Sequence, residues 1–131
     1  LFSISELMEV SDRCAMKVTS DGKPDFSTLL SYGNEAVMLE KLITETEKEM
    51  RLMQDEATKK DMKGLDAITH HLRSSWEVLR ADQPLRVLYG LLHGKDKPDT
   101  EALSNAVTAV LDKGAEIIRL AEEERRKYEN G

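Results

Sequence analysis

The sequence of 131 residues has little of what marks many protein classes: one cysteine, three prolines, seven glycines and 5% aromatic residues. The small number of glycines and prolines excludes collagen and proline-rich low-complexity chains. A single cysteine, Cys14, excludes an internal disulfide and a zinc knuckle. Because an unpaired thiol suits a reducing compartment, we expect a cytoplasmic protein.

Long apolar runs and an excess of positive charge are also missing. No run approaches the ~20 apolar residues that cross a bilayer, and these residues do not open with a basic-then-apolar leader. Lysine and arginine number 19 against 25 aspartates and glutamates, which gives a formal net charge of -6. Such a surface repels nucleic-acid phosphates. We therefore expect neither a membrane nor a nucleic acid as a partner.

What the chain does have is helical periodicity. Hydrophobic residues make up 40% of it and charged residues 34%, and the apolar ones recur at intervals of three and four rather than two. This pattern predicts an all-α fold, an up-and-down bundle of four main helices with bent or interrupted segments near Gly33 and Pro84. We expect one helical-bundle domain over residues 1–131, of which 122–131 form a charged, fraying C-terminal extension.

The clearest pattern is a heptad repeat of about four periods, which predicts a helix from Asn34 to Lys63. Gly64 is then expected to take a left-handed cap, and Asp66 to start the next helix as its N-cap. Gly33 and Asn34 before this helix predict a break or a kink. The expected seam comprises Leu29, Ala36, Ile43, Met50 and Ala57, with Tyr32, Leu39, Thr46 and Met53 at the intermediate positions.

Shorter apolar stripes predict the remaining helices. One stripe runs from Ile4 to Val18, and a short helix is expected from Phe26 to about Tyr32. The last helix should begin after Asp96 or Asp99, and at its charged end we expect ion pairs four residues apart. These pairs are Glu122 with Arg126 and Glu123 with Lys127. A third helix should bury Leu65, Ile68, Leu72, Trp76 and Leu79 before Pro84 bends the chain.

One polar stripe on this third helix is the candidate binding site. Its residues are spaced by four, three, four and three, so they share one helix face beside the apolar stripe. Two interpretations remain open: a solvated ladder of ion pairs, or an anion site in which two arginines hold a phosphate or carboxylate and a histidine moves protons. The stripe is Asp66, His70, Arg73, Glu77 and Arg80, and the last four are the predicted ligand-binding residues.

Motifs for metal or cofactor chemistry are missing from the sequence. No glutamate stands three residues before any of the three histidines, which excludes the Glu-x-x-His pairs of ferritin-like diiron proteins. Adjacent histidines such as His70 and His71 point about 100° apart on a helix and cannot share one ion. The chain also has no phosphate-binding glycine loop and no nucleophile elbow. We expect no metal and no cofactor, and the catalytic residues, if there are any, stay unknown.

The sequence therefore favours a small interaction or assembly protein without catalytic activity. Glutamates flank the expected heptad seam, as in helices that select a partner helix. We expect self-association into a homo-oligomer, or binding to another helical protein. The alternative is an enzyme or a helical bundle that binds a small anion or nucleotide, with the stripe of His70, Arg73, Glu77 and Arg80 in a cleft between helices or subunits.

Overall fold

The computed structural model describes residues 23–129, and these residues form five helices and no strand. About 80% of the described residues are helical, so the all-α prediction is confirmed. The expected helix from Ile4 to Val18, with Cys14, lies outside the described residues. The helices are α1 (Ser27–Leu30), α2 (Glu35–Lys59), α3 (Met62–Val78), α4 (Gln83–Leu92) and α5 (Thr100–Glu129).

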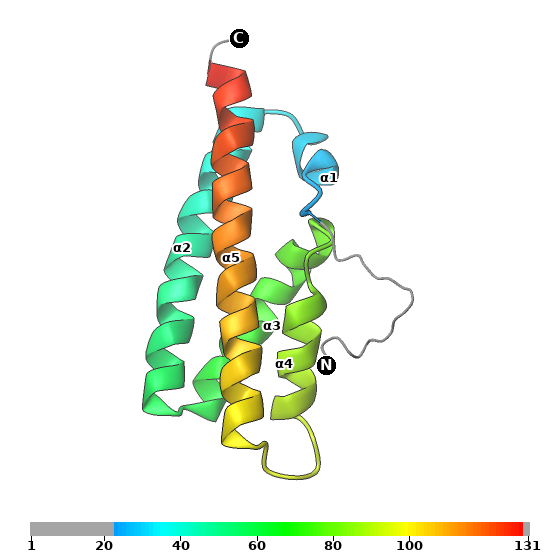
Figure 1. The fold of residues 1–131 in the computed structure, drawn as a ribbon. Coiled ribbons are helices and arrows are strands. Elements are labelled where there is room, and N and C mark those ends of the chain that lie inside the picture. Colours follow the sequence, from blue (N-terminus) through cyan, green and yellow to red (C-terminus); the bar gives the residue numbers. More distant parts are fainter. Residues whose placement is uncertain (1–22, 130–131) are drawn as a thin grey trace.

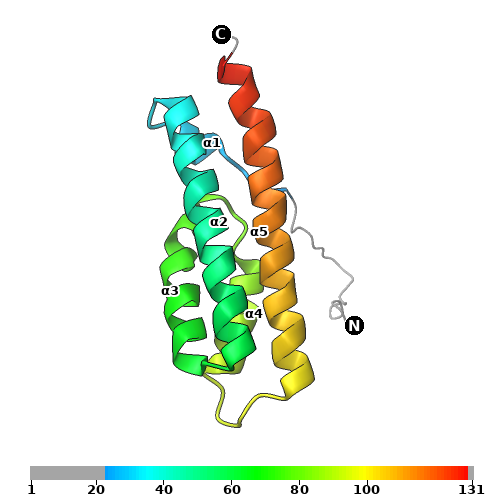
Figure 2. The same cartoon turned by 90° about the vertical axis from the view of Figure 1, so that its left-hand side faces the viewer.

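The two longest helices, α2 and α5, lie side by side and run in opposite directions (Figure 1). Helix α3 packs against α2, and α4 packs against both α3 and α5. Figure 2 shows α1 at the same end of the molecule as the start of α2 and the end of α5. The turns from α2 to α3 and from α4 to α5 lie together at the opposite end.

The two predicted interruptions occur in the structure. Gly33 and Asn34 both have positive φ angles, 85° and 53°, and they separate α1 from α2. Arg80, with a φ of 58°, lies in the turn between α3 and α4. Pro84 occupies the first turn of α4, where its missing N–H costs no helical hydrogen bond.

The turn from α2 to α3 comes four residues earlier than predicted. Helix α2 ends at Lys59, and Lys60 rather than Gly64 takes the left-handed cap with a φ of 58°. Asp61 rather than Asp66 is the N-cap of α3, and its carboxylate accepts a 3.0 Å hydrogen bond from the Gly64 amide. The prediction favoured glycine for the left-handed position, but the capping bond of Asp61 fixes the start of α3 first. Gly64 therefore lies inside the first turn.

The carboxyl groups of Glu56 and Asp61 meet at this turn. The hydrogen bond from the Gly64 amide lowers the pKa of Asp61. A hydrogen bond with Asp61 raises the pKa of Glu56, because the shared proton is held on the glutamate. The side chain of Glu56 also fills the space beside Gly64 where a Cβ atom would otherwise stand. The turn is thus closed by a local polar cluster.

The predicted heptad seam of α2 faces the core. Leu39, Ile43, Thr46, Met50 and Met53 are all buried, as expected for residues that repeat on one helix face. Tyr32, which the repeat placed on the same seam, is 71% exposed because the helix begins only at Glu35. The five apolar residues predicted for the third helix are also buried: Leu65, Ile68, Leu72, Trp76 and Leu79.

The helices differ in length, and this divides the molecule into two parts. At 1.5 Å per residue, α5 spans about 45 Å and α2 about 38 Å, whereas α3 spans about 26 Å and α4 about 15 Å. Helices α3 and α4 therefore accompany α2 and α5 over only part of their length (Figure 1). We call this the four-helix part. The three-helix part consists of residues 25–42, which hold α1 and the start of α2, and residues 119–129 of α5, where Arg125 faces Glu40.

The charged C-terminal residues continue α5 to Glu129. Arg125 lies 3.7 Å from Glu40 of α2, so this end of α5 is tied to the helix beside it. The two ion pairs predicted here do not form. Instead, Glu123 pairs with Arg119 at 3.3 Å and Lys127 pairs with Glu124 at 3.0 Å, because spacings of three and four compete on one helix face.

Candidate functional site

The predicted polar stripe is not one continuous ladder in the structure. Helix α3 ends at Val78, so Arg80 has left the helix face that carries Arg73 and Glu77. Within α3, Arg73 Nε lies 3.4 Å from Glu77 Oε2, and the Arg73 guanidinium lies 5.2 Å from the centre of the Tyr89 ring. Arg80 Nε is 3.9 Å from Asp25 Oδ2, before α1. Each arginine therefore has an acidic neighbour.

Asp66 and His70 do not interact with each other either. Asp66 Oδ1 lies 2.7 Å from Nε2 of His93, the C-cap of α4, and His70 is exposed. The His93 ring stacks on Tyr89 with ring centroids 4.2 Å apart. This contact links α3 to α4 and gives Asp66 and His93 a structural role. The ligand-binding role expected of His70, Arg73, Glu77 and Arg80 stays a prediction.

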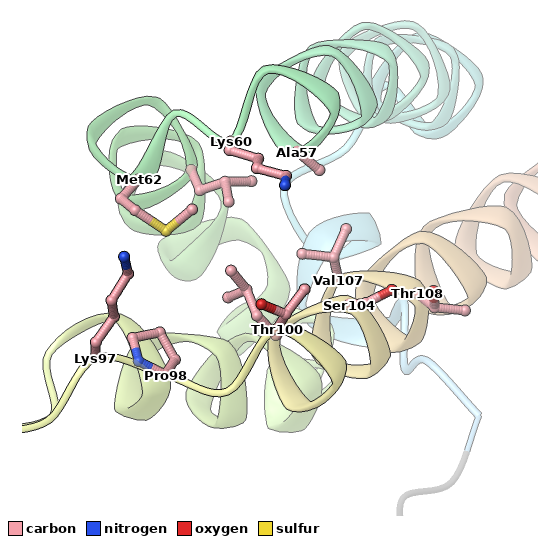
Figure 3. Close-up of a pocket in the computed structure, with 11 residues that line it drawn as sticks. Ala57, Lys60, Met62, Lys97, Pro98, Thr100, Ser104, Val107 and Thr108 are labelled. Carbon is pink, nitrogen blue, oxygen red and sulfur yellow. The ribbon is translucent and has the colours of Figure 1, made fainter.

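A cavity larger than the two hollows described below lies elsewhere, at the end formed by the α2–α3 and α4–α5 turns (Figure 3). It has a volume of about 540 Å³, within the range of roughly 300–1,000 Å³ that is usual for small-molecule sites. Helices α2 and α3 form one side, and the start of α5 with the preceding loop forms the other. The apolar lining comprises Ala57, Met62, Leu65, Pro98, Leu103 and Val107, and Thr100, Ser104 and Thr108 add hydroxyl groups.

Two lysines supply all the charge of this lining. Lys60 enters from the α2–α3 turn and Lys97 from the α4–α5 loop, and no carboxylate of residues 23–129 lines the cavity. Neither lysine has an ion-pair partner within residues 23–129. Figure 3 shows them on different sides of the cavity. In a chain of net charge -6, this end is thus an apolar hollow with a positively charged edge.

Two smaller hollows have different chemistry. The one between α2 and α3, about 210 Å³, is lined in part by Glu45, Glu49 and His71, with His71 Nε2 3.8 Å from Glu49 Oε1. Among the residues that the structure describes, no group of three or more side chains is placed to hold a metal ion. The other hollow, about 190 Å³, lies between Pro24, Phe26 and the end of α5.

Of the eight large apolar side chains that are exposed among residues 23–129, three lie at the three-helix part. Tyr32 precedes α2, Val37 lies on its first turn and Tyr128 on the last turn of α5. Their exposed fractions are 71%, 63% and 38%. Large exposed aromatic side chains are typical of surfaces that bind other proteins.

The sequence reasoning missed the cavity because its lining comes from three separate segments. In the sequence, Lys60 is one of several lysines near a predicted helix end, and Lys97 lies in the polar segment before the last predicted helix. Nothing in the sequence shows that the two turns carrying them meet at one end of the molecule. The only available signal was that both residues adjoin predicted helix boundaries.

Comparison with models of known protein families, with curated proteins and with solved structures gives no match for this chain. Between residues 23 and 129, none of the helices combines the length and the apolar character that a bilayer crossing demands. The function proposed below therefore rests on the geometry of the chain itself.

Proposed function

We propose that this protein is a non-catalytic interaction module: one domain, built as an up-and-down bundle of four main helices, that associates with another helical chain through its three-helix part. The observation that carries the proposal is the exposure of Tyr32, Val37 and Tyr128 at this part. Two of the three tyrosines of the chain lie here. Tyrosine offers a large contact area at a small cost in side-chain entropy, which favours it at binding surfaces.

The packing of the three-helix part supports this proposal. Among residues 23–129, the four-residue helix α1 is the only element that accompanies α2 and α5 here, and its Leu29 and Leu30 are partly buried. An added helix would cover these side chains further and so remove more apolar surface from water. Charged residues of α2 and α5, such as Glu40 and Arg125, would form a polar rim around such a contact.

A second copy of this chain is the partner we propose first. Sedimentation equilibrium over a range of concentrations should show a reversible dimer for the parent protein. The double variant Tyr32→Ser/Val37→Ser should be monomeric at concentrations where the parent is dimeric, because it removes two exposed apolar contacts.

The matched control replaces two apolar residues that are exposed elsewhere, Leu52 on α2 and Val87 on α4. Leu52→Ser/Val87→Ser should dimerise like the parent protein. A parent that stays monomeric at every concentration would contradict self-association. Equal weakening by both double variants would contradict the proposed location.

The other expectations stay predictions. The cytoplasmic location, and the absence of nucleic-acid and membrane partners, rest on composition and charge. The alternative function, an enzyme or small-anion site built on His70, Arg73, Glu77 and Arg80, requires arginines free to bind a ligand. The 3.4 Å pair between Arg73 and Glu77 favours the interaction module over this alternative.

A further inference from the structure

We propose that the cavity between the α2–α3 turn and the start of α5 binds an aliphatic carboxylate, an unbranched apolar chain that ends in a carboxyl group. This site lies at the opposite end of the molecule from the proposed association surface, so the two proposals stand independently. Three features of the cavity carry the inference: its apolar lining, the sign of its charge and its size.

The apolar lining selects the body of the ligand. Leu65, Leu103 and Val107 belong to the core or pack against it, and Met62 lies in the first turn of α3. A flexible methionine side chain adapts to ligands of different shape, and aliphatic walls offer no directional polar contact. An alkyl chain therefore suits this lining better than a sugar or a nucleotide base does.

The charge of the lining selects the head of the ligand. Within the described part of the chain, Lys60 and Lys97 are the only charged residues that line the cavity. A carboxylate beside either lysine would form a solvent-exposed ion pair, which contributes modestly to affinity but strongly to the choice of sign.

The size of the cavity fits a chain of moderate length. A volume of about 540 Å³ holds a medium-length fatty acid, whereas acetate would leave most of the apolar lining uncovered. Each buried methylene group strengthens binding by a fixed factor, so affinity should rise about tenfold for every two methylenes up to the filling of the cavity.

Decanoate, used below its critical micelle concentration, is the probe that tests this site. Isothermal titration calorimetry should show saturable binding of one decanoate per chain, with hexanoate much weaker. Decyltrimethylammonium, with the same alkyl chain and a positive head, should bind more weakly than decanoate. The overall charge of -6 by itself would favour binding of the cation. Tighter binding of decanoate would therefore indicate a local positive site.

Charge-matched variants locate the head group. Lys60→Gln/Lys97→Gln should weaken decanoate binding roughly tenfold and reduce the preference for decanoate over the cation. The control Lys59→Gln/Lys95→Gln removes two neighbouring lysines that do not line the cavity and should bind like the parent. Both double variants carry the same net charge, so a difference between them reports position.

Size-matched variants locate the chain. Ser104→Trp places a large ring at the cavity and should abolish decanoate binding, whereas Asn105→Trp, on the next residue and outside the lining, should not. Circular dichroism would verify that each variant remains helical. Absence of saturable decanoate binding to the parent would overturn the proposal. So would equal binding of the cation, or equal effects within either matched pair of variants.

Discussion

The four-helix part and the three-helix part of this molecule differ in how completely they bury their apolar side chains. In the four-helix part, Leu65, Trp76, Leu85 and Leu88 are almost fully buried. In the three-helix part, the apolar residues of α1 are only partly buried, and large side chains remain exposed. The difference follows from helix length, since α3 and α4 end before α2 and α5 do. Among residues 23–129, helices of unequal length thus leave one part with a less complete core.

The two parts also differ in their polar contacts. The four-helix part has the capped turn at Asp61 and the contact between Asp66 and His93, both of which join successive helices. The three-helix part has ion pairs along α5 and one between α5 and α2. Exposed ion pairs contribute less to stability than buried apolar surface does. We therefore expect the four-helix part to provide most of the stability.

The largest expected effect on the free energy of unfolding comes from truncating a leucine to alanine, which can be compared between the two parts. Leu65→Ala, in the four-helix part, should lower the free energy of unfolding by about 2–5 kcal/mol, because Leu65 is 0% exposed and its truncation leaves a cavity. Leu29→Ala, on partly buried α1, should cost about 1 kcal/mol, since it removes less buried surface. Urea titration of both variants measures the difference. Equal losses would mean that the two parts are equally well packed.

A smaller effect on stability should come from adding a methyl group where α2 and α5 approach each other closely. Both parts of the molecule contain segments of these two helices. A Cβ atom on Gly114 would clash with the Met50 side chain inside the core. We expect Gly114→Ala to cost about 1 kcal/mol, because the clash outweighs the better helix propensity of alanine.

Gly90 provides the matched control for this substitution. A Cβ atom there would meet no other atom within 4 Å, so Gly90→Ala should stabilise the protein by up to about 1 kcal/mol. Adding Met50→Ala to Gly114→Ala should relieve the clash. The loss of stability caused by Met50→Ala alone, which removes a buried side chain, is measured for comparison. Thermal melts that place Gly114→Ala level with Gly90→Ala would show that α2 and α5 do not approach as closely as described.

The smallest expected effect concerns pH and compares one aspartate in each part. A hydrogen bond from the Ser27 hydroxyl lowers the pKa of Asp25 below its ordinary value of 3.8, and the Gly64 amide lowers that of Asp61. A lowered pKa stabilises the fold above pH 3.8, and this contribution is lost as the pH falls through the folded-state pKa. The pKa of Glu56 is raised above 4.5, so its contribution is present below pH 4.5 and is lost as the pH rises.

At the α2–α3 turn, the pH-dependent contributions of Asp61 and Glu56 to stability have opposite signs and should partly cancel. The contribution of Asp25 has no such opposing partner. Asp25→Asn should therefore reduce the loss of thermal stability between pH 5 and pH 3 more than Asp61→Asn does. Melting curves followed by circular dichroism at several pH values would measure this. A larger change for Asp61→Asn would show that Glu56 and Asp61 do not share a proton.

Much of the fold follows from spacing along the chain. The heptad seam of α2, the buried face of α3 and the interruptions at Gly33 and Pro84 are local properties, because helix periodicity and turn chemistry act over a few residues. The α2–α3 turn was misplaced because two local signals competed, a glycine at position 64 and an aspartate cap at position 61. The polar stripe was overextended because α3 ends before Arg80.

The sequence by itself determined that this chain is helical, where most of its helices lie and which of their faces are apolar, since these depend on neighbours within one or two turns. Only the tertiary structure decided that Asp66 contacts His93, that Lys60 and Lys97 line one cavity, and that α1 is the one described helix beside the ends of α2 and α5. These relations join residues that are distant in the sequence. They depend on the lengths and packing of whole helices, which no local pattern records.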